Sequence, residues 1–148
     1  AFTELPSQTL GTDESSHRDS ALKDAEVIVS GGRGIRKREN VLLIKRLAAL
    51  FPRSAIGASR SACDLGWFER KHQVGTTGQT VSPKLYIACG ISGAFQHLSG
   101  MRGAQTIVAI NTDMHAPIFQ VAHYSIVEDL ETFIPLLIEA TNRTPPFR

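Results

Sequence analysis

The chain has 148 residues, of which 42% are hydrophobic and 20% are charged, and its formal net charge is +2. This length suffices for one well-packed core, and a charge so near to neutral does not favour nucleic acid or an anionic membrane surface as a partner. No apolar run has the length of a bilayer span and residues 1–20 lack the order of a secretory signal, so we expect a soluble, non-secreted protein without membrane insertion.

From Ala25 onward, short apolar runs rich in β-branched residues alternate with segments of helical periodicity. We predict strands at residues 25–30, 54–59, 85–90, 106–111 and 124–127. The apolar spacing predicts helices over about 41–50, 92–100 and 128–140, with Pro135 as a kink in the last. This alternation indicates an α/β fold, a doubly wound parallel sheet with helices on both faces.

The two ends of the chain differ from this central part. Residues 1–24 are polar, lack sustained periodicity and begin with alanine rather than methionine, so we expect a linker or tail from a preceding domain. We expect the folded domain over residues 25–140 and a C-terminal tail over 141–148. Cys63 and Cys89 form no C-x-x-C pair, which predicts buried free thiols and no metal site.

Small, hydroxylic and cationic residues follow the predicted strands. In chain order these segments read GGRG, SRSACD, GISGAFQH, NTDMHAP and EDL. Ligands of such sheets bind beyond the carboxyl ends of the strands, so the segments predict a site at one edge of the sheet. Residues 73–83, QVGTTGQTVSP, add a loop whose glycines and threonines suit close packing against a flat or negatively charged group.

The GGRG loop at residues 31–34 favours an anion. Glycine lets backbone N–H groups approach a ligand closely, the following helix adds a positive dipole end, and Arg33 adds formal charge. The spacing matches neither the G-x-G-x-x-G fingerprint nor the P-loop. On these residues alone, a phosphate-binding loop and an ordinary strand-to-helix turn with a solvated basic rim are equally good interpretations.

Seven motifs in order carry a family resemblance: VSGGRG, GASRSACD, QVGTTG, SPKLYIACGISGAFQHLSGM, TIVAIN, APIFQVA and IVEDL. Together they resemble the C-terminal, FAD-binding domain of the electron transfer flavoprotein alpha subunit, over about residues 25–140. The resemblance implies a Rossmann-like fold similar to the nucleotide domains of sirtuins and deoxyhypusine synthase. It also implies a non-covalently bound FAD as the cofactor.

The resemblance places the family's cofactor contacts on the loops after the predicted strands. These positions are Arg33, Ser59, Arg60, Val74, Gly75, Thr76, Thr77, Ser92, Gly93, Ala94, Phe95, Gln96, His97, Asn111, Asp129 and Leu130. No residue is implied to be catalytic, because the flavin carries the chemistry.

Each group of contacts has an implied role. Arg60, with Ser59, resembles the pair beside the flavin ring, where a guanidinium favours the electron density of a reduced flavin. Thr77 is implied near N5 and His97 near the pyrimidine edge of the ring. The helix expected from Ser92 would turn its N-terminus toward the pyrophosphate or ribityl chain.

The adenosine contacts are implied at Asn111 and at Asp129 with Leu130, and Asp129 could equally cap its own helix. Two positions depart from the family pattern. Thr76 stands where glutamine is common, and threonine cannot donate two amide hydrogens. His123 stands where aspartate is common, a change that the sequence does not explain.

The implied function is an electron carrier between flavin dehydrogenases and a quinone oxidoreductase or similar acceptor, rather than an enzyme that converts a substrate. The implied partner is an electron transfer flavoprotein beta subunit. The expected compartment is the cytoplasm, or the mitochondrial matrix in a eukaryote. The alternative is a non-redox nucleotide-binding or structural module that retains the family fold, which the departures at Thr76 and His123 would favour.

Overall fold

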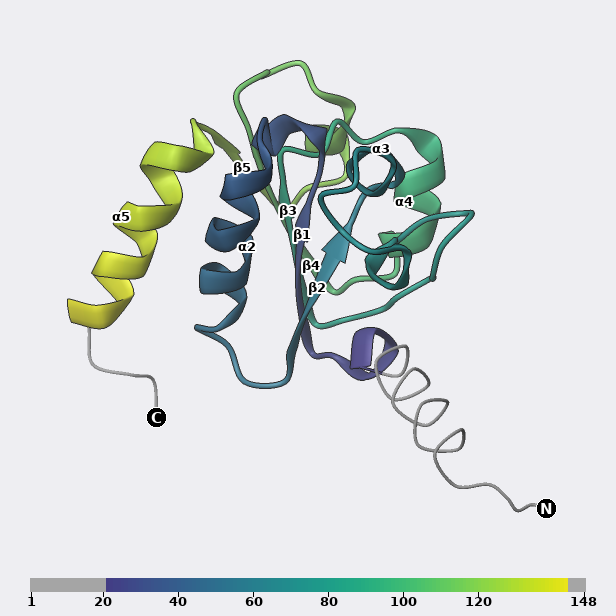
Figure 1. Ribbon diagram of the computed structural model, residues 1–148, viewed down its shortest axis with the longest axis horizontal. Coiled ribbons are helices and arrows are strands. Elements are labelled where there is room, and N and C mark those ends of the chain that lie inside the picture. The colour runs from purple at the N-terminus through teal and green to yellow at the C-terminus, as the bar shows by residue number, and fades with distance from the viewer. Residues whose placement is uncertain (1–20, 144–148) are drawn as a thin grey trace, which may run out of the picture.

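The computed structural model describes residues 21–143, which form one parallel sheet and its covering helices (Figure 1). The strand order is β2-β1-β3-β4-β5, and every pairing is parallel. The strands are β1 (Val27–Gly31), β2 (Ser54–Ala58), β3 (Leu85–Cys89), β4 (Thr106–Asn111) and β5 (Tyr124–Val127). This arrangement confirms the predicted doubly wound parallel sheet, with strand ends moved by one or two residues at β1, β2 and β3.

Helices cover both faces of the sheet. The helices are α2 (Val41–Ala48), α3 (Arg60–Asp64), α4 (Phe95–Met101) and α5 (Leu130–Arg143). In Figure 1, α2 and α5 lie side by side to the left of the sheet and α4 lies to its right. Each face has its own hydrophobic core, which confirms the two-sided covering.

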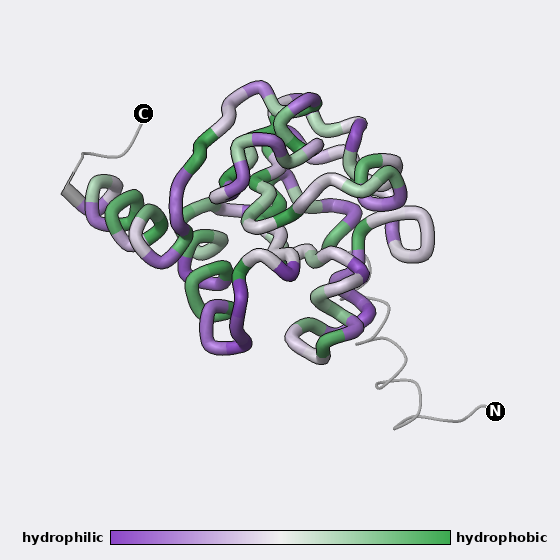
Figure 2. Tube along the Cα trace, turned by 90° about the horizontal axis from the view of Figure 1, so that it is seen from above, coloured by the Kyte–Doolittle hydropathy of each residue, from purple (hydrophilic) through white to green (hydrophobic). Residues whose placement is uncertain are grey.

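Side chains of β1 pack alternately into the two cores. Ile28 and Val29 are both fully buried, because neighbouring residues of a strand point to opposite faces. Ile28 packs in the same core as Met101 of α4, and Val29 packs with Ile44 of α2. Burying side chains of this size contributes about 1.5–3 kcal/mol each. Figure 2 shows the turns of α5 alternating between hydrophobic and hydrophilic residues, as a helix covering one face requires.

Two helix starts differ from the sequence prediction. Helix α4 begins at Phe95 rather than near Ser92, because Gly93 has a φ of +98° and lies against the backbone of Ile118. Helix α5 runs from Leu130 to Arg143 and contains Pro135, so it starts two residues and ends three residues after the predicted range of 128–140. Residues 21–24 form a helical turn whose Leu22 is buried in the core, although the composition of residues 1–24 predicts a linker.

Strands β1 and β3 lie at the centre of the sheet, where the chain connections diverge. From β1 the chain passes to β2 on one side, and from β3 it passes to β4 on the other. Such a divergence leaves a crevice beyond the strand ends, where doubly wound sheets bind ligands. Here Gly34 packs against Gly90, whose φ of +66° suits glycine, and a Cβ on Gly34 would lie 2.6 Å from the Gly90 carbonyl oxygen.

Within residues 21–143, no helix combines the length and apolar character needed to cross a bilayer.

Candidate functional site

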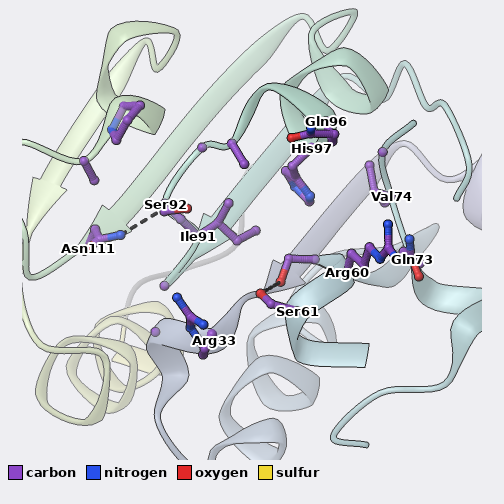
Figure 3. Close-up of a pocket in the computed structure, with 18 of the residues that line it drawn as sticks. Arg33, Arg60, Ser61, Gln73, Val74, Ile91, Ser92, Gln96, His97 and Asn111 are labelled. Atoms are coloured by element: carbon purple, nitrogen blue, oxygen red, sulfur yellow. Dashed lines mark hydrogen bonds between the residues drawn. The ribbon is translucent and has the colours of Figure 1, made fainter. Parts of the chain in front are cut away.

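A cleft of about 530 Å³ opens at the carboxyl ends of the strands (Figure 3). This volume lies within the range of small-molecule sites. The cleft brings together most of the positions that the resemblance implies. They are Arg33, Ser59, Arg60, Val74, Gly75, Thr76, Thr77, Ser92, Gly93, Ala94, Gln96, His97 and Asn111.

The glycine loop after β1 offers a side chain rather than a cradle of N–H groups. The N–H groups of Gly32 and Gly34 already donate to the carbonyls of Cys89 and Gly90, at 2.9 and 2.8 Å. These bonds fasten the loop to β3, so the expected backbone contact with an anion is not available at these two positions. Arg33 is exposed on the cleft wall and forms no ion pair within the part of the chain that is described.

The segment after β3 supplies the free backbone donors instead. Among the described residues, the N–H groups of Ser92, Gly93 and Ala94 donate to no other backbone group, and all three residues line the cleft. Gly93 turns the chain away from the helical path before α4 begins. Three consecutive free N–H groups suit an anion such as a phosphate.

The end of β2 leads into the short helix α3, which the sequence prediction missed. Ser59 caps this helix by accepting a hydrogen bond from the Ala62 N–H at 3.2 Å. Arg60 follows and lines the cleft, with its Nε 3.8 Å from a carboxylate oxygen of Asp64. The five-residue helix is too short for hydrophobic periodicity to reveal, although Ser59 is a typical N-cap residue.

The loop at residues 74–78 is hydrogen-bonded to the end of β2 and to α4. The Val74 N–H donates to Ala58 at 2.9 Å, and the Thr76 N–H donates to Gln96 at 2.8 Å. Gly75 makes the second approach possible, because a Cβ there would lie 2.8 Å from the Gln96 carbonyl oxygen. The loop is therefore held on both sides and forms one wall of the cleft.

Thr76 uses its hydroxyl on this wall. Its Oγ1 lies 2.8 Å from Ser99 Oγ and 3.2 Å from the Gln96 carbonyl oxygen, both in α4. The threonine that departs from the family pattern therefore has a local partner.

Thr77 belongs to a second set of contacts, which includes a cleft residue that the sequence analysis did not single out. Gln73 is 3% exposed and places its Nε2 2.6 Å from Thr77 Oγ1. The Oε1 of Gln73 lies 2.9 Å from Nη1 of Arg70. Gln73 stands in the quoted motif QVGTTG, but nothing in that motif reveals which side chains it contacts.

His97 lies on the cleft wall opposite Arg33 and Arg60 (Figure 3). Its Nε2 is 2.8 Å from the hydroxyl of Tyr86. The buried Nδ1 forms no hydrogen bond of ordinary geometry, and the backbone of Val74 is the polar group that acts on this side of the imidazole. Burial lowers the pKa of His97 to about 4, so the imidazole is neutral at neutral pH. A buried nitrogen without a well-formed hydrogen bond is costly, and a polar ligand atom in the cleft would provide one.

At the end of β4, the side chain of Asn111 forms hydrogen bonds with two loops at the cleft. Its Nδ2 donates to the Ile91 carbonyl at 3.1 Å, and its Oδ1 accepts from the Asp113 N–H at 2.9 Å. Both Asn111 and Asp113 line the cleft.

Three implied positions lie outside the cleft lining. Phe95 is 71% exposed, because α4 begins there and turns this residue outward. Leu130 is buried with Ile134 in the core beneath α5. Asp129 pairs with Arg36 and accepts a hydrogen bond from the Thr132 N–H, which confirms its predicted capping role.

The second departure also has a local partner. His123 accepts a hydrogen bond from the Ile107 N–H through Nδ1 at 2.9 Å, and its own N–H donates to the Ile107 carbonyl at 2.8 Å. The imidazole thus supports the start of the β4–β5 pairing, an acceptor role that a carboxylate can also fill.

The residues that the structure describes include no cluster of ligands suited to a metal ion. Cys63 and Cys89 are both free and buried, as predicted. Burial raises the pKa of the Cys89 thiol to about 12, which makes it unreactive at neutral pH.

Comparison with known proteins agrees with this geometry. The chain matches the family model for the electron transfer flavoprotein FAD-binding domain over residues 21–102. It is 57% identical to the electron transfer flavoprotein subunit alpha of Thermoanaerobacterium thermosaccharolyticum over 118 residues, which cover 80% of this chain and 36% of that protein.

Two further relatives show similar coverage. The electron transfer flavoprotein subunit alpha of Megasphaera elsdenii is 51% identical over 82% of this chain and 36% of its own length. Protein FixB of Azotobacter vinelandii is 54% identical over 80% of this chain and 33% of its own length. The chain thus spans about a third of the length of the curated relatives that it matches. It belongs to the electron transfer flavoprotein alpha family, within that family's FAD-binding domain.

Proposed function

We propose that the cleft binds FAD and that the chain is the cofactor domain of an electron carrier. The observation that carries this proposal is the set of groups gathered at the strand ends: the cations Arg33 and Arg60, the free N–H groups of residues 92–94 and the neutral imidazole of His97. Cations and free N–H groups suit a pyrophosphate, and a neutral imidazole suits a polar ring edge.

The residues present fit such a cofactor. Residues 92–94 would hold the phosphates, and Asn111 at the end of β4 would lie toward the adenosine half. Arg60 and Thr77, on the other side of the cleft, would contact the ring. The flavin, when bound, supplies the gain and loss of electrons.

The protein's own part is binding and electrostatics. A guanidinium at Arg60 favours added negative charge on a neighbouring ring, less strongly where water screens it. Arg60 is exposed, so its effect depends on what covers the cleft. His97 is neutral and buried, so it offers a hydrogen bond without a formal charge.

We further propose a beta subunit as the partner that covers the cleft, with flavin dehydrogenases as donors and a quinone oxidoreductase or similar acceptor. Phe95 and Met114 support a partner surface, because they are 71% and 66% exposed and are chain neighbours of cleft residues. The two free thiols fit the reducing cytoplasm, or the matrix in a eukaryote. FAD should dissociate more slowly once the beta subunit is added, because a partner that prefers the bound state stabilises it.

The two changes that favoured the non-redox alternative have a local structural explanation. The changes at Thr76 and His123 that favoured it have local partners in Ser99 and Ile107. Neither change removes a group from the rest of the cleft.

Identification of the bound cofactor tests the proposal. The purified chain, expressed with its beta subunit, is denatured and the released small molecule is chromatographed and its absorption spectrum recorded. The proposal predicts FAD in stoichiometric amount. Release of FMN or a nicotinamide nucleotide instead, or of no nucleotide from a protein reconstituted with FAD, would overturn it.

A further inference from the structure

The orientation of the Gln73 amide is fixed by a neighbour that can only donate. Nη1 of Arg70 lies 2.9 Å from one end of the amide, and a guanidinium has no acceptor atom. The end that faces Arg70 is therefore Oε1, and the other end, 2.6 Å from Thr77 Oγ1, is the NH₂ group. Gln73 is 3% exposed, so its amide is shielded from water, whereas Arg70 and Thr77 are exposed.

This orientation decides what Thr77 can do. Because Nε2 of Gln73 only donates, Thr77 Oγ1 must accept, and its own proton is left for another partner. Thr77 lines the cleft, and no second hydrogen bond of its hydroxyl occurs within residues 21–143. We propose that Gln73, held by Arg70, is a positioning residue that presents the Thr77 hydroxyl to the cleft as a hydrogen-bond donor.

Arg70 is itself held in place. Its Nη2 lies 2.5 Å from a carboxylate oxygen of Asp64, which belongs to α3. The Gln73 N–H donates to the Arg70 carbonyl at 3.0 Å, so the local turn brings the two side chains together. The contacts therefore run from Asp64 through Arg70 and Gln73 to Thr77, and each has one permitted direction.

A ligand should therefore meet the Thr77 hydroxyl with an atom that carries a lone pair rather than with an N–H group. This step rests on the proposed function, because the ring of an oxidised flavin carries such acceptor atoms. A ligand form protonated at that atom would place a donor against a donor, which costs binding energy. The hydrogen bond from Gln73 to Thr77 thus favours the unprotonated form of the ring atom that faces Thr77.

The hydrogen bond from Gln73 to Thr77 can be tested first without any flavin. In the ¹⁵N-labelled, cofactor-free full chain, exchange of the Gln73 side-chain NH₂ with water is compared with that of Gln105, which is exposed. We expect exchange at Gln73 to be at least about tenfold slower and to speed up in Thr77→Val. Equal exchange rates at Gln73 and Gln105, or no effect of Thr77→Val on the Gln73 rate, would overturn the proposed orientation of Thr77 by Gln73.

The effect on the ligand is then measured by a cycle of variants, with FAD affinity read from flavin fluorescence. Gln73→Glu is nearly isosteric and keeps an acceptor for Arg70, but its carboxylate accepts a hydrogen bond from the Thr77 hydroxyl, which then turns a lone pair toward the cleft. Thr77→Val should weaken FAD binding about fivefold, as for one lost hydrogen bond. The Thr77→Val background measures the direct effect of the added charge.

We expect Gln73→Glu to weaken FAD binding at least about threefold more in the parent than in Thr77→Val, which is the coupling that a relay through Thr77 requires. Equal effects in both backgrounds would show that Gln73 does not act through Thr77. If the full chain with its beta subunit bound no FAD, the proposed function would fail, while the amide exchange rates would still decide whether Gln73 orients Thr77.

Discussion

The hydroxyl of Tyr86 lies 2.8 Å from Nε2 of His97, and both side chains are buried between β3 and α4. Burial lowers the pKa of His97 and raises that of Tyr86, so a neutral imidazole meets a neutral phenol at neutral pH. The other imidazole nitrogen is buried at the wall of the cleft, where it forms no well-aligned hydrogen bond and faces the Val74 backbone. One ring nitrogen is thus fixed by the core, and the other lies on the cleft side of the ring.

The buried His97 should make folding stability depend on pH. Its pKa is about 4 in the folded chain and near 6.5 when unfolded, so between these values the unfolded chain binds more protons. Stability is therefore complete above about pH 6.5 and falls as the pH drops toward 4, by about 3 kcal/mol at most. Urea unfolding between pH 7 and about 4.5 should show a shallower fall in His97→Gln than in the parent.

The pKa of His72 is also lowered by burial, so part of the fall should persist in that variant and serves as an internal reference. An identical pH dependence in His97→Gln and the parent would contradict a buried neutral His97.

Removal of the phenol hydroxyl should destabilise the fold. Tyr86→Phe leaves Nε2 of His97 buried without its partner, which we expect to cost about 1–3 kcal/mol. Tyr124→Phe is the matched control, because Tyr124 is 64% exposed on the edge strand β5. The control should change the unfolding free energy by no more than about 0.5 kcal/mol. Equal effects of the two variants on urea unfolding would argue against a significant Tyr86–His97 contact.

The close approach of Gly34 and Gly90 should not tolerate a methyl group. In Gly34→Ala the new Cβ would meet three backbone atoms of Gly90 at 2.6 to 3.0 Å, so one loop must move. We expect a loss of about 1–3 kcal/mol in the unfolding free energy and weaker FAD binding. In Gly103→Ala the new Cβ would approach Ser82 Oγ at 2.7 Å, but a hydroxyl can rotate away. A Gly34→Ala chain as stable as Gly103→Ala would refute the packing argument.

Arg60→Ala should make a bound flavin harder to reduce, because a cation near the ring stabilises added negative charge. We expect the reduction potential to fall by tens of millivolts, because Arg60 is exposed and a charge pair about 4 Å apart is worth about 1 kcal/mol where water screens it. Arg46→Ala is the control, because Arg46 is exposed on α2, away from the cleft. Potentiometric titration of both variants measures the difference. An unchanged or higher potential in Arg60→Ala would remove Arg60 from the ring environment.

The sequence predicted the sheet well, because each strand is an apolar run long enough to stand out from its neighbours. The start of α4 was not predictable in this way, since it depends on the contact of Gly93 with Ile118, a residue far along the chain. Helix α3 spans Arg60–Asp64 and is too short for a periodic signal.

The location of the site followed from the rule that parallel strands end at one edge, and the resemblance supplied most of the lining. Gln73 was not singled out, because its role depends on the directions of Arg70 and Thr77 side chains. The sequence placed anion contacts both at the GGRG loop and at a helix start near Ser92. It could not show that the N–H groups of Gly32 and Gly34 are already bonded, or that Ser92 and Gly93 lie in a loop before α4 with their N–H groups free.

The most direct test of the account is to locate FAD on the chain. The ¹⁵N-labelled, cofactor-free chain is titrated with FAD while the backbone N–H signals of its glycines are followed. The account predicts that Gly34, Gly75 and Gly93, which line the cleft, shift together and saturate at one equivalent of FAD, while Gly66 and Gly103 keep their positions. Absence of any shift at the cleft glycines, or shifts confined to Gly66 and Gly103, would contradict FAD binding at the strand ends.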